Sequence, residues 1–432
     1  MDFPNRRVFP PAFIPDHLIA EILSFLSVKT ILRLKCVSKS WYTLISHPTF
    51  VQNHLNKSSR NPNFTLTLDD GYTFIPFRHL LENPSIAVKS DAFLQNPSLA
   101  ALNDTSLQNQ FLDILPHFND FKIVDSCNGL ILLCSKSRSI RLGYEYRFYI
   151  WNPATRIIYD KLGSLYYCAP NFQDHHLGFK FAFGFDDTTE RYKVVAYRVV
   201  EDDNEDTTLG KSEVKVFSLG DSCWRNILSF PVIPLNWINL RYAYHNDAVH
   251  LSGTINWLAV KSYFHTFYEY KYITHVEQFV IVSLDLSTET YKQLLLPPGF
   301  DKVPSVQPVI RVLMDCLCFS HDFKNSEFVL WQMKEYGVQE SWTQLFKIDY
   351  QNLQLNRLFN FRLVCLYING DEVIILNGFN NQAVVYNLKN EIVQRIKLKI
   401  YNLKNLVVTR FDNNNNRFTH AKYYVESLVS VS

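Results

Sequence analysis

The sequence predicts an α+β multidomain chain: a small N-terminal helical unit followed by an all-β domain with a β-propeller-like fold. Its 432 residues are many for a single hydrophobic core. Apolar residues follow a helical period over residues 14–55, and the period changes to two after Asn61-Pro62. A weak repeat then runs through the β region, which favours a propeller.

The helical unit begins at Ile14-Pro15-Asp16. The residues that follow place apolar side chains on one helix face: Leu18, Ile19, Ile22, Leu23 and Leu26. We expect Thr30 to cap a second helix, and Ser38 to cap a third that ends at Pro48. A short helix over 50–55 completes the unit.

The β region contains runs of alternating or β-branched residues that predict strands at 64–68, 192–200, 279–286, 372–376 and 423–429. Sequences typical of turns separate them, at 152–153, 186–187, 219–221, 369–371 and 413–416.

The repeat is a strand, a polar turn and a second strand. Its copies begin near Tyr149, Val216, Val282, Leu330 and Val385. Their spacing of roughly 50 to 65 residues is near that of propeller repeats, so a β-propeller is the first choice and a stack of β-sandwiches the alternative.

Composition excludes several classes of function. Hydrophobic residues make up 47% of the chain and charged residues 19%, which is typical of a globular protein. A net charge of +2 gives no electrostatic reason to expect nucleic-acid or membrane-surface binding. We find neither a secretory signal nor an apolar run of about 20 residues. Eight scattered cysteines do not resemble a disulfide scaffold, so we expect a reduced protein of the cytoplasm, the nucleus or both.

Some forty residues of short helices cannot bury their own apolar face well. They must pack on the β-domain or on another chain, and the pattern alone leaves both readings open. The first sixty residues hold eight Lys/Arg and three Asp/Glu, so a partner surface is expected to be acidic.

Residues 14–26 (IPDHLIAEILSFL), 28–41 (VKTILRLKCVSKSW) and 45–50 (ISHPTF) resemble an F-box. Two departures are Ile14, where the family usually has Leu, and Ser27, where a second Pro is common. The resemblance implies docking on a Skp-type adaptor and, through it, a cullin. It assigns adaptor binding to Pro15, Leu18, Ile22, Leu26, Leu32 and Val37, with Leu23 and Trp41 in the core.

The remainder resembles the plant F-box-associated domain of proteins named F-box/kelch-repeat. The matching motifs lie in family order at 125–130 (DSCNGL), 151–156 (WNPATR), 183–186, 192–195, 253–258, 331–337, 341–342 and 424–428 (YVESL). The chain has no Gly-Gly pair of the kind kelch blades carry. The expected organisation is an F-box over 12–56, a connecting segment over 57–110 that can add a strand to the β-domain, and the β-domain over 111–430.

The resemblance implies a non-catalytic receptor that recruits a protein target for ubiquitylation. Alternatives are an F-box protein that binds its adaptor without a degradative role, and a propeller enzyme. We find no catalytic motif, cofactor loop or metal constellation. Cys316 and Cys318 lack two further zinc ligands, His175-His176 lacks a carboxylate partner, and the acidic run 201–206 lacks a calcium-loop pattern.

Two aromatic-rich insertions are the candidates for target binding, because interfaces favour Trp, Tyr and Arg on loops. They contain the candidate residues Trp237, Tyr242, Tyr244, Phe267 and Tyr268. An alternative remains for each. Trp237 can be a core anchor, and the alternation of Tyr268, Tyr270 and Tyr272 also fits a half-buried strand.

Overall fold

The computed structural model describes residues 14–58, 63–68, 71–76, 87–89, 121–139, 143–160, 162–168, 178–200, 211–237, 248–261, 269–353, 363–377, 382–395, 399–402, 407–410 and 420–430. All structural statements below concern these residues. The candidates Tyr242, Tyr244, Phe267 and Tyr268, the His175-His176 pair and the acidic run 201–206 lie outside them.

The helical unit consists of α1 (Asp16–Leu23), α2 (Val28–Leu34), α3 (Lys39–Ser46) and α4 (Pro48–Ser58). Ser38 caps α3 as predicted, since its hydroxyl accepts a hydrogen bond from the Trp41 N–H at 3.1 Å. The predicted cap of α2 was wrong. Ser27, not Thr30, is the cap residue, so α2 begins at Val28 and buries that side chain. The last helix extends beyond the expected 50–55.

The described strands form seven sheets. Sheet I holds β4 (Phe121–Cys127), β5 (Leu130–Ser139), β6 (Gly143–Asn152), β7 (Ile157–Tyr159) and β8 (Leu165–Cys168). Sheet II holds β9 (Lys180–Asp186), β10 (Arg191–Val200), β11 (Lys211–Ser218) and β12 (Arg225–Ile227). Sheet III holds β13 (Ile233–Pro234), β14 (Val249–Leu251), β15 (Thr254–Val260), β16 (Phe279–Asp285) and β17 (Tyr291–Leu294).

Sheets IV and V are four-stranded. Sheet IV holds β18 (Val309–Leu313), β19 (Cys316–Phe323), β20 (Glu327–Met333) and β21 (Trp342–Asp349), and sheet V holds β22 (Leu363–Asn369), β23 (Glu372–Asn377), β24 (Gln382–Asn387) and β25 (Val393–Arg395). Sheet VI joins β26 (Lys399–Asn402) and β27 (Val407–Arg410) to β3 (Ala87–Lys89). Sheet VII joins β1 (Asn63–Leu68) and β2 (Gly71–Pro76) to β28 (His420–Tyr424).

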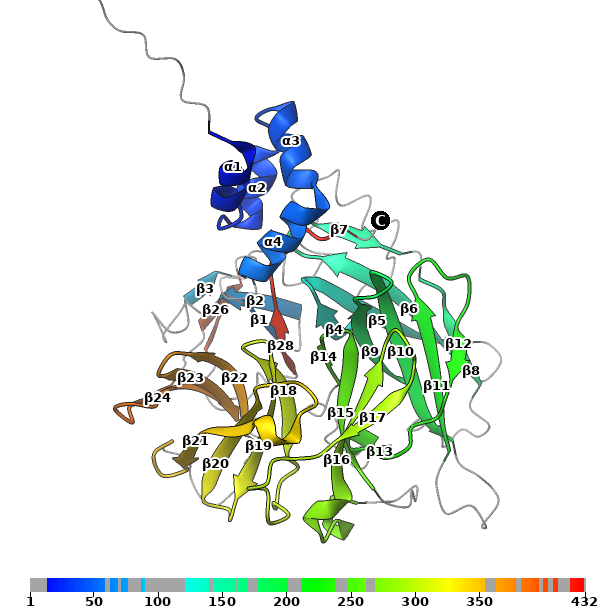
Figure 1. Cartoon of the computed structure of the whole chain (residues 1–432), viewed down its shortest axis with the longest axis vertical. Coiled ribbons are helices and arrows are strands. Elements are labelled where there is room, and N and C mark those ends of the chain that lie inside the picture. The colour runs from blue at the N-terminus through cyan, green and yellow to red at the C-terminus, as the bar shows by residue number, and fades with distance from the viewer. Residues whose placement is uncertain are drawn as a thin grey trace, which may run out of the picture.

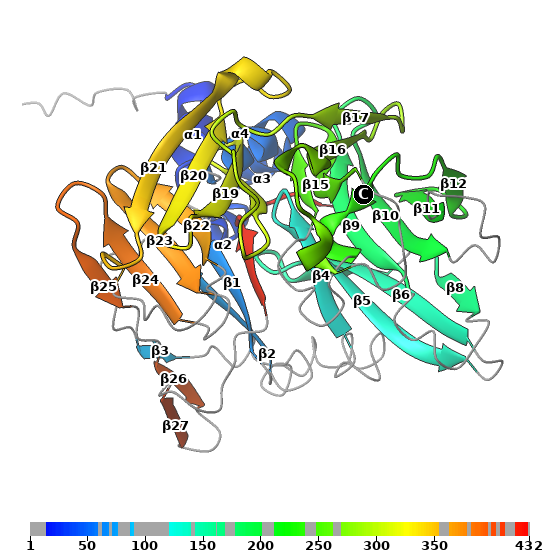
Figure 2. The ribbon, with the colours of Figure 1, turned by 90° about the horizontal axis from the view of Figure 1, so that it is seen from below.

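Sheets I to V and sheet VII are arranged as the blades of a β-propeller. Within sheets II, IV and V each strand pairs with the next along the chain. The first strand of one sheet contacts that of its neighbour, as β4 does β9, and β18 does β22. Seen from below, the sheets surround a common centre (Figure 2). The propeller prediction is therefore confirmed, and the helical unit lies on one side of the ring (Figure 1).

Both ends of the β region meet in sheet VII. Strand β1 pairs with β28 in antiparallel register, with Asn63 opposite Tyr424, and β3 pairs in parallel with β26. The segment before residue 90 thus supplies strands to two sheets. The run at 423–429 was predicted as one strand, but β28 ends at Tyr424. Residues 425–430 leave the sheet because their polar groups bond to a neighbouring turn, described below.

The sequence repeat corresponds to the third and fourth strands of successive sheets, such as β6–β7 and β16–β17. Three of their turns share one geometry. The Oδ1 atoms of Asn152, Asp285 and Asn387 each accept hydrogen bonds from the backbone N–H groups two and three residues later. The residue four positions later has a positive φ: 65° at Arg156, 56° at Glu289 and 59° at Glu391.

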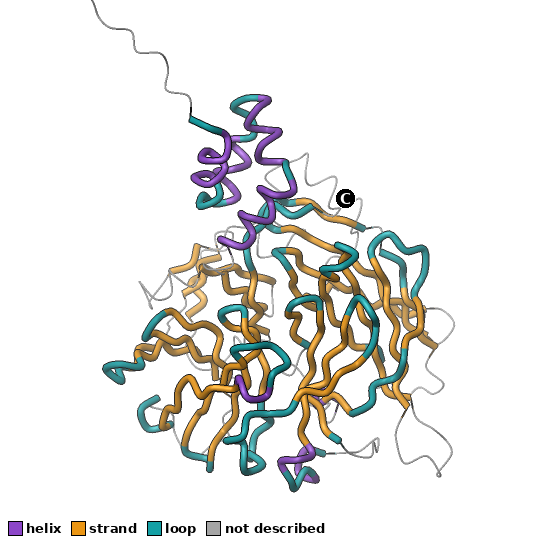
Figure 3. Tube along the Cα trace, viewed as in Figure 1, coloured by secondary structure: helices purple, strands orange, loops and turns teal. Residues whose placement is uncertain are grey.

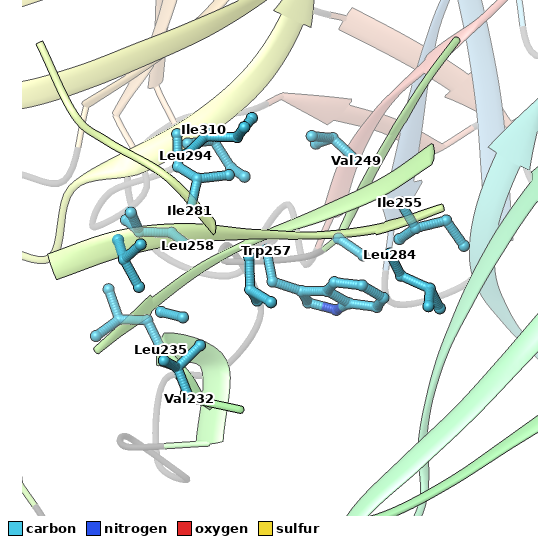
Figure 4. Close-up of a cluster of buried hydrophobic side chains, with 14 of the residues drawn as sticks. Val232, Leu235, Val249, Ile255, Trp257, Leu258, Ile281, Leu284, Leu294 and Ile310 are labelled. Carbon is cyan, nitrogen blue, oxygen red and sulfur yellow. The ribbon is translucent and has the colours of Figure 1, made fainter. Parts of the chain in front are cut away.

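The largest core cluster lies among sheets II, III and IV. Figure 4 shows Trp257, from β15, beside aliphatic side chains that include Leu235, Ile255 and Leu284. Trp257 is 1% exposed. Burying aromatic and branched side chains between neighbouring blades is what holds the ring together.

Candidate functional site

The helical unit has a small core of its own. Leu23, Val28, Ile31 and Ile45 are at most 4% exposed and pack together with Phe50. Trp41 is half-buried against this cluster, as expected for the largest side chain of so small a unit. One face of each helix packs into this core, and the opposite faces can make other contacts.

The outward face of α1 is apolar. Leu18 is 47% exposed and Ile22 61%, and their spacing of four residues places them on one side of the helix. Phe25, in the turn that follows α1, is 69% exposed. Val37 is exposed between α2 and α3. Large apolar side chains gathered on a unit of this size mark a surface that another protein covers.

The six predicted adaptor-binding residues divide between two environments. Leu18, Ile22 and Val37 are exposed, whereas Leu26 and Leu32 are half-buried against the helical core. Pro15 is the N-cap of α1, and its carbonyl accepts the N–H of Leu18 at 3.0 Å.

Sequence reasoning missed three further large apolar residues that are exposed on the helical unit: Ile14, Phe25 and Tyr42, by 51%, 69% and 58%. We define the apolar face of the helical unit as these three residues with Leu18, Ile22 and Val37. Phe25 follows Leu18 by seven residues, a spacing that could have identified it. Tyr42 lies on a different helix, and only the packing of α3 shows that its side chain is exposed.

The end of α1 is fixed to α4 by Lys57. Its ammonium lies 2.5 Å from Glu21 Oε1 and 2.7 Å from Ser24 Oγ. The same ammonium lies 3.7 Å from the centroid of the Phe25 ring. The position of Phe25 on the apolar face therefore depends on a residue of the last helix.

The helical unit also exposes basic residues. Lys29, Arg33 and Lys39 are exposed on α2 and α3, and the Lys35 ammonium lies 5.6 Å from the Tyr42 ring centroid. Residues 14–58 contain five Lys/Arg and only two Asp/Glu. Such an excess of positive charge attracts an acidic partner surface and speeds its association.

Trp237 is 8% exposed and belongs to the core. Its ring centroid lies 5.5 Å from those of both Tyr197 and Phe230. Its burial favours the core-anchor reading over target binding. The strand alternative for the second insertion is wrong where it is described. Tyr270–Tyr272 is a 3-10 helix, in which the hydroxyl of Tyr270 donates to the Pro304 carbonyl while Tyr272 is 53% exposed.

One cysteine–histidine pair has the spacing of a nucleophile and its base. Cys127 Sγ lies 3.4 Å from His250 Nδ1, and His250 Nε2 lies 3.0 Å from the Phe185 carbonyl. Burial raises the pKa of the Cys127 thiol well above its ordinary value and lowers the pKa of His250. Both groups are then neutral at pH 7, so the pair joins three strands rather than forming a thiolate.

In the described part of the chain, the other groups considered for metal binding or catalysis have structural roles. Cys316 and Cys318 on β19 are free thiols whose pKa burial raises. No three His, Cys, Asp or Glu side chains gather as metal ligands among the residues described. A search of those same residues for a helix long and apolar enough to cross a membrane found none.

Comparisons with known proteins agree with this geometry. Residues 13–53 match the family model of the F-box domain, and residues 85–431 match that of the F-box associated beta propeller domain. An F-box/kelch-repeat protein of Arabidopsis thaliana is 25% identical over 90% of this chain and 92% of its own length. The F-box protein CPR1 of Arabidopsis thaliana is 25% identical over 90% of this chain and 85% of its own.

Proposed function

The chain belongs to the F-box proteins that carry an F-box-associated β-propeller domain, and we propose that it is the target-recognition subunit of a Skp–cullin–F-box ubiquitin ligase. F-box proteins of this class generally act as non-catalytic receptors. The observation that carries the proposal is the apolar face of the helical unit, exposed on a domain whose family binds a Skp-type adaptor.

A receptor of this kind needs no catalytic side chain. Holding a target beside a charged conjugating enzyme raises the effective concentration of the reacting groups, and this supplies the rate. The neutral Cys127–His250 pair is consistent with that role. No observation favours the propeller-enzyme alternative over it.

The target would bind the side of the ring far from the helices. Turns on the near side, at Asn128-Gly129 and 153–156, are covered by residues 425–430. The 3-10 helices Tyr270–Tyr272 and Val276–Gln278 lie at the opposite end of the ring (Figure 3). Tyr272 is exposed there, and the Lys271 ammonium lies 5.1 Å from its ring.

The adaptor step is tested by binding of purified Skp-type adaptor to the full chain and to the double variant Leu18→Ala, Ile22→Ala. The proposal expects the variant to lose binding while its melting temperature stays unchanged. Binding at wild-type strength by the folded variant would contradict the proposal. Target recognition is tested separately, by affinity capture from proteasome-inhibited tissue followed by ubiquitylation of the captured protein with the reconstituted ligase.

A further inference from the structure

Three motifs that are distant in the sequence converge beneath the helical unit. They are 125–130 at the β4–β5 turn, 151–156 at the β6–β7 turn, and 424–428 at the end of β28. In Figure 1 the red C-terminal segment lies next to β7, on the side of the ring that carries the helices. The function proposed above assigns no binding role to any of the three.

Asn152 connects two of the motifs. Its Nδ2 donates hydrogen bonds to the carbonyls of Ser427 and Val429, at 3.0 and 2.8 Å. Its Oδ1 is occupied by the turn, where it accepts from the Ala154 and Thr155 N–H groups. Asn152 is 3% exposed and Ser427 is fully buried, so these bonds are shielded from water.

The turn itself does not require an amide at position 152. Asp285 and Asp186 build the same kind of turn with a carboxylate, which accepts from backbone N–H groups two and three residues later. Only the Nδ2 group distinguishes Asn152 from these residues, and its bonds go to the C-terminal segment.

Gly129 connects the third motif. Its φ is +79°, and a Cβ built there would lie 2.5 Å from both Ser427 Oγ and the Val425 carbonyl oxygen. The C-terminal segment therefore rests directly on the Gly129 backbone, at a distance that a side chain would prevent.

The opposite side of the segment contacts the helical unit. Leu428 is 7% exposed and belongs to the core cluster of Leu23, Val28, Ile31, Ile45 and Phe50. The Glu426 carboxylate accepts a hydrogen bond from the Val28 N–H at the start of α2. Ala154, from the β6–β7 turn, packs on the same cluster.

We propose that residues 425–430 form a C-terminal clasp that fixes the orientation of the F-box on the propeller. Asn152 and Gly129 hold the clasp on the ring, and Leu428 inserts it into the helical core. The clasp directly follows β28, which pairs with β1, so ring closure and F-box placement are coupled. Its consequence for ubiquitylation rests on the proposed function, because a fixed orientation sets how far a bound target lies from the conjugating enzyme.

The test compares Asn152→Asp with Asn387→Asp in the full chain. Both keep an Oδ1 acceptor for their turns and both lose the Nδ2 group. Only in Asn152→Asp does this loss remove hydrogen bonds to the C-terminal segment and place a carboxylate against two carbonyls. Hydrogen exchange at the Val429 amide, which bonds Ser427 Oγ, should accelerate by about tenfold or more in Asn152→Asp only. Equal exchange in wild type and Asn152→Asp, or equal acceleration in both variants, would overturn the clasp.

A distance measurement tests the orientation itself. Spin-labelled cysteines replace two exposed residues, Lys39 on α3 and Lys292 on β17. The same chain carries Cys36→Ser and Cys223→Ser, which remove the two thiols that are exposed among the described residues. The clasp predicts a narrow distance distribution that Asn152→Asp broadens and Asn387→Asp leaves narrow. A distribution equally narrow in all three chains would refute a fixing role.

Gly129→Ala provides a second perturbation with its own control. Gly370 has a φ of +58° and no atom within 4 Å of a built Cβ, so Gly370→Ala carries the backbone strain without the collision. Only Gly129→Ala should broaden the distance distribution. Neither readout uses the adaptor, so an adaptor-binding failure would count against the proposed function while leaving the clasp intact.

Discussion

The side-chain amide of Asn152 donates a 2.8 Å hydrogen bond to the carbonyl of Val429, 277 positions later in the chain. The bond joins the turn between two strands of sheet I to a segment that lies outside every sheet. Through Leu428, the same segment reaches the core of the helical unit. A single buried amide thus participates in the contact between the two parts of the protein.

The apolar face should contribute to binding and not to folding. Leu18 and Ile22 are exposed, so the change of both to Ala should alter the unfolding free energy by no more than about 0.5 kcal/mol each. Adaptor affinity should fall by about thirtyfold or more, because central apolar contacts dominate interfaces. Titration calorimetry measures the affinity. Leu228→Ala, at a 69% exposed propeller residue, is the control and should bind normally.

The helical unit should be dispensable for folding of the propeller. Its described contacts with the ring are made mainly through Leu428, Ala154 and Glu426. A chain of residues 61–432 should retain a cooperative thermal transition at a slightly lower temperature, because Leu428 becomes exposed. Circular dichroism during heating measures this. A non-cooperative melt would show that helices and strands share one core.

The Lys193 ammonium should stabilise the folded state far more than a surface cation does. It lies 3.0 Å from Asp186, whose side chain is 1% exposed, and 3.3 Å from Glu289. Lys193→Met should cost about 3 to 5 kcal/mol, because it leaves a buried carboxylate without its cation. Lys215→Met, which breaks a partly exposed pair with Glu213, should cost about 1 kcal/mol or less. Urea unfolding distinguishes them, and equal costs would contradict the assignment.

Stability should fall as the pH drops below about 6.5. Burial lowers the pKa of His54, His250 and His321 from the ordinary value of 6.5. Between the folded and unfolded pKa values the unfolded chain binds more protons, so stability is complete above pH 6.5 and is lost as protons are added. Melting temperatures from pH 8 to pH 5 measure this loss.

The contribution of one histidine to this pH dependence of stability can be isolated. His321 is 3% exposed, and its ring lies beside those of Phe300, Phe319 and Phe323. His321→Phe places a fourth aromatic ring there and removes the titrating group. The melting temperature should then depend less steeply on pH between 5 and 6.5, and an unchanged slope would exclude His321 as a source.

The sequence by itself determined the helical unit, the β-domain and the family. Local rules suffice for these features. Helical and strand periods are read from neighbouring residues, and three of the repeated turns depend on an Asn or Asp two and three positions from its partners. The same local spacing identified Leu18 and Ile22 as members of one face.

Tertiary structure decided how distant segments meet. The pairing of β1 with β28, the burial of Trp237 and the departure of residues 425–430 from the sheet depend on partners remote in the chain. The exposed position of Tyr42 also depends on how α3 packs. Asn152 shows the limit most clearly. Its Oδ1 serves a turn that the sequence predicts, whereas its Nδ2 bonds a segment that only folding brings within reach.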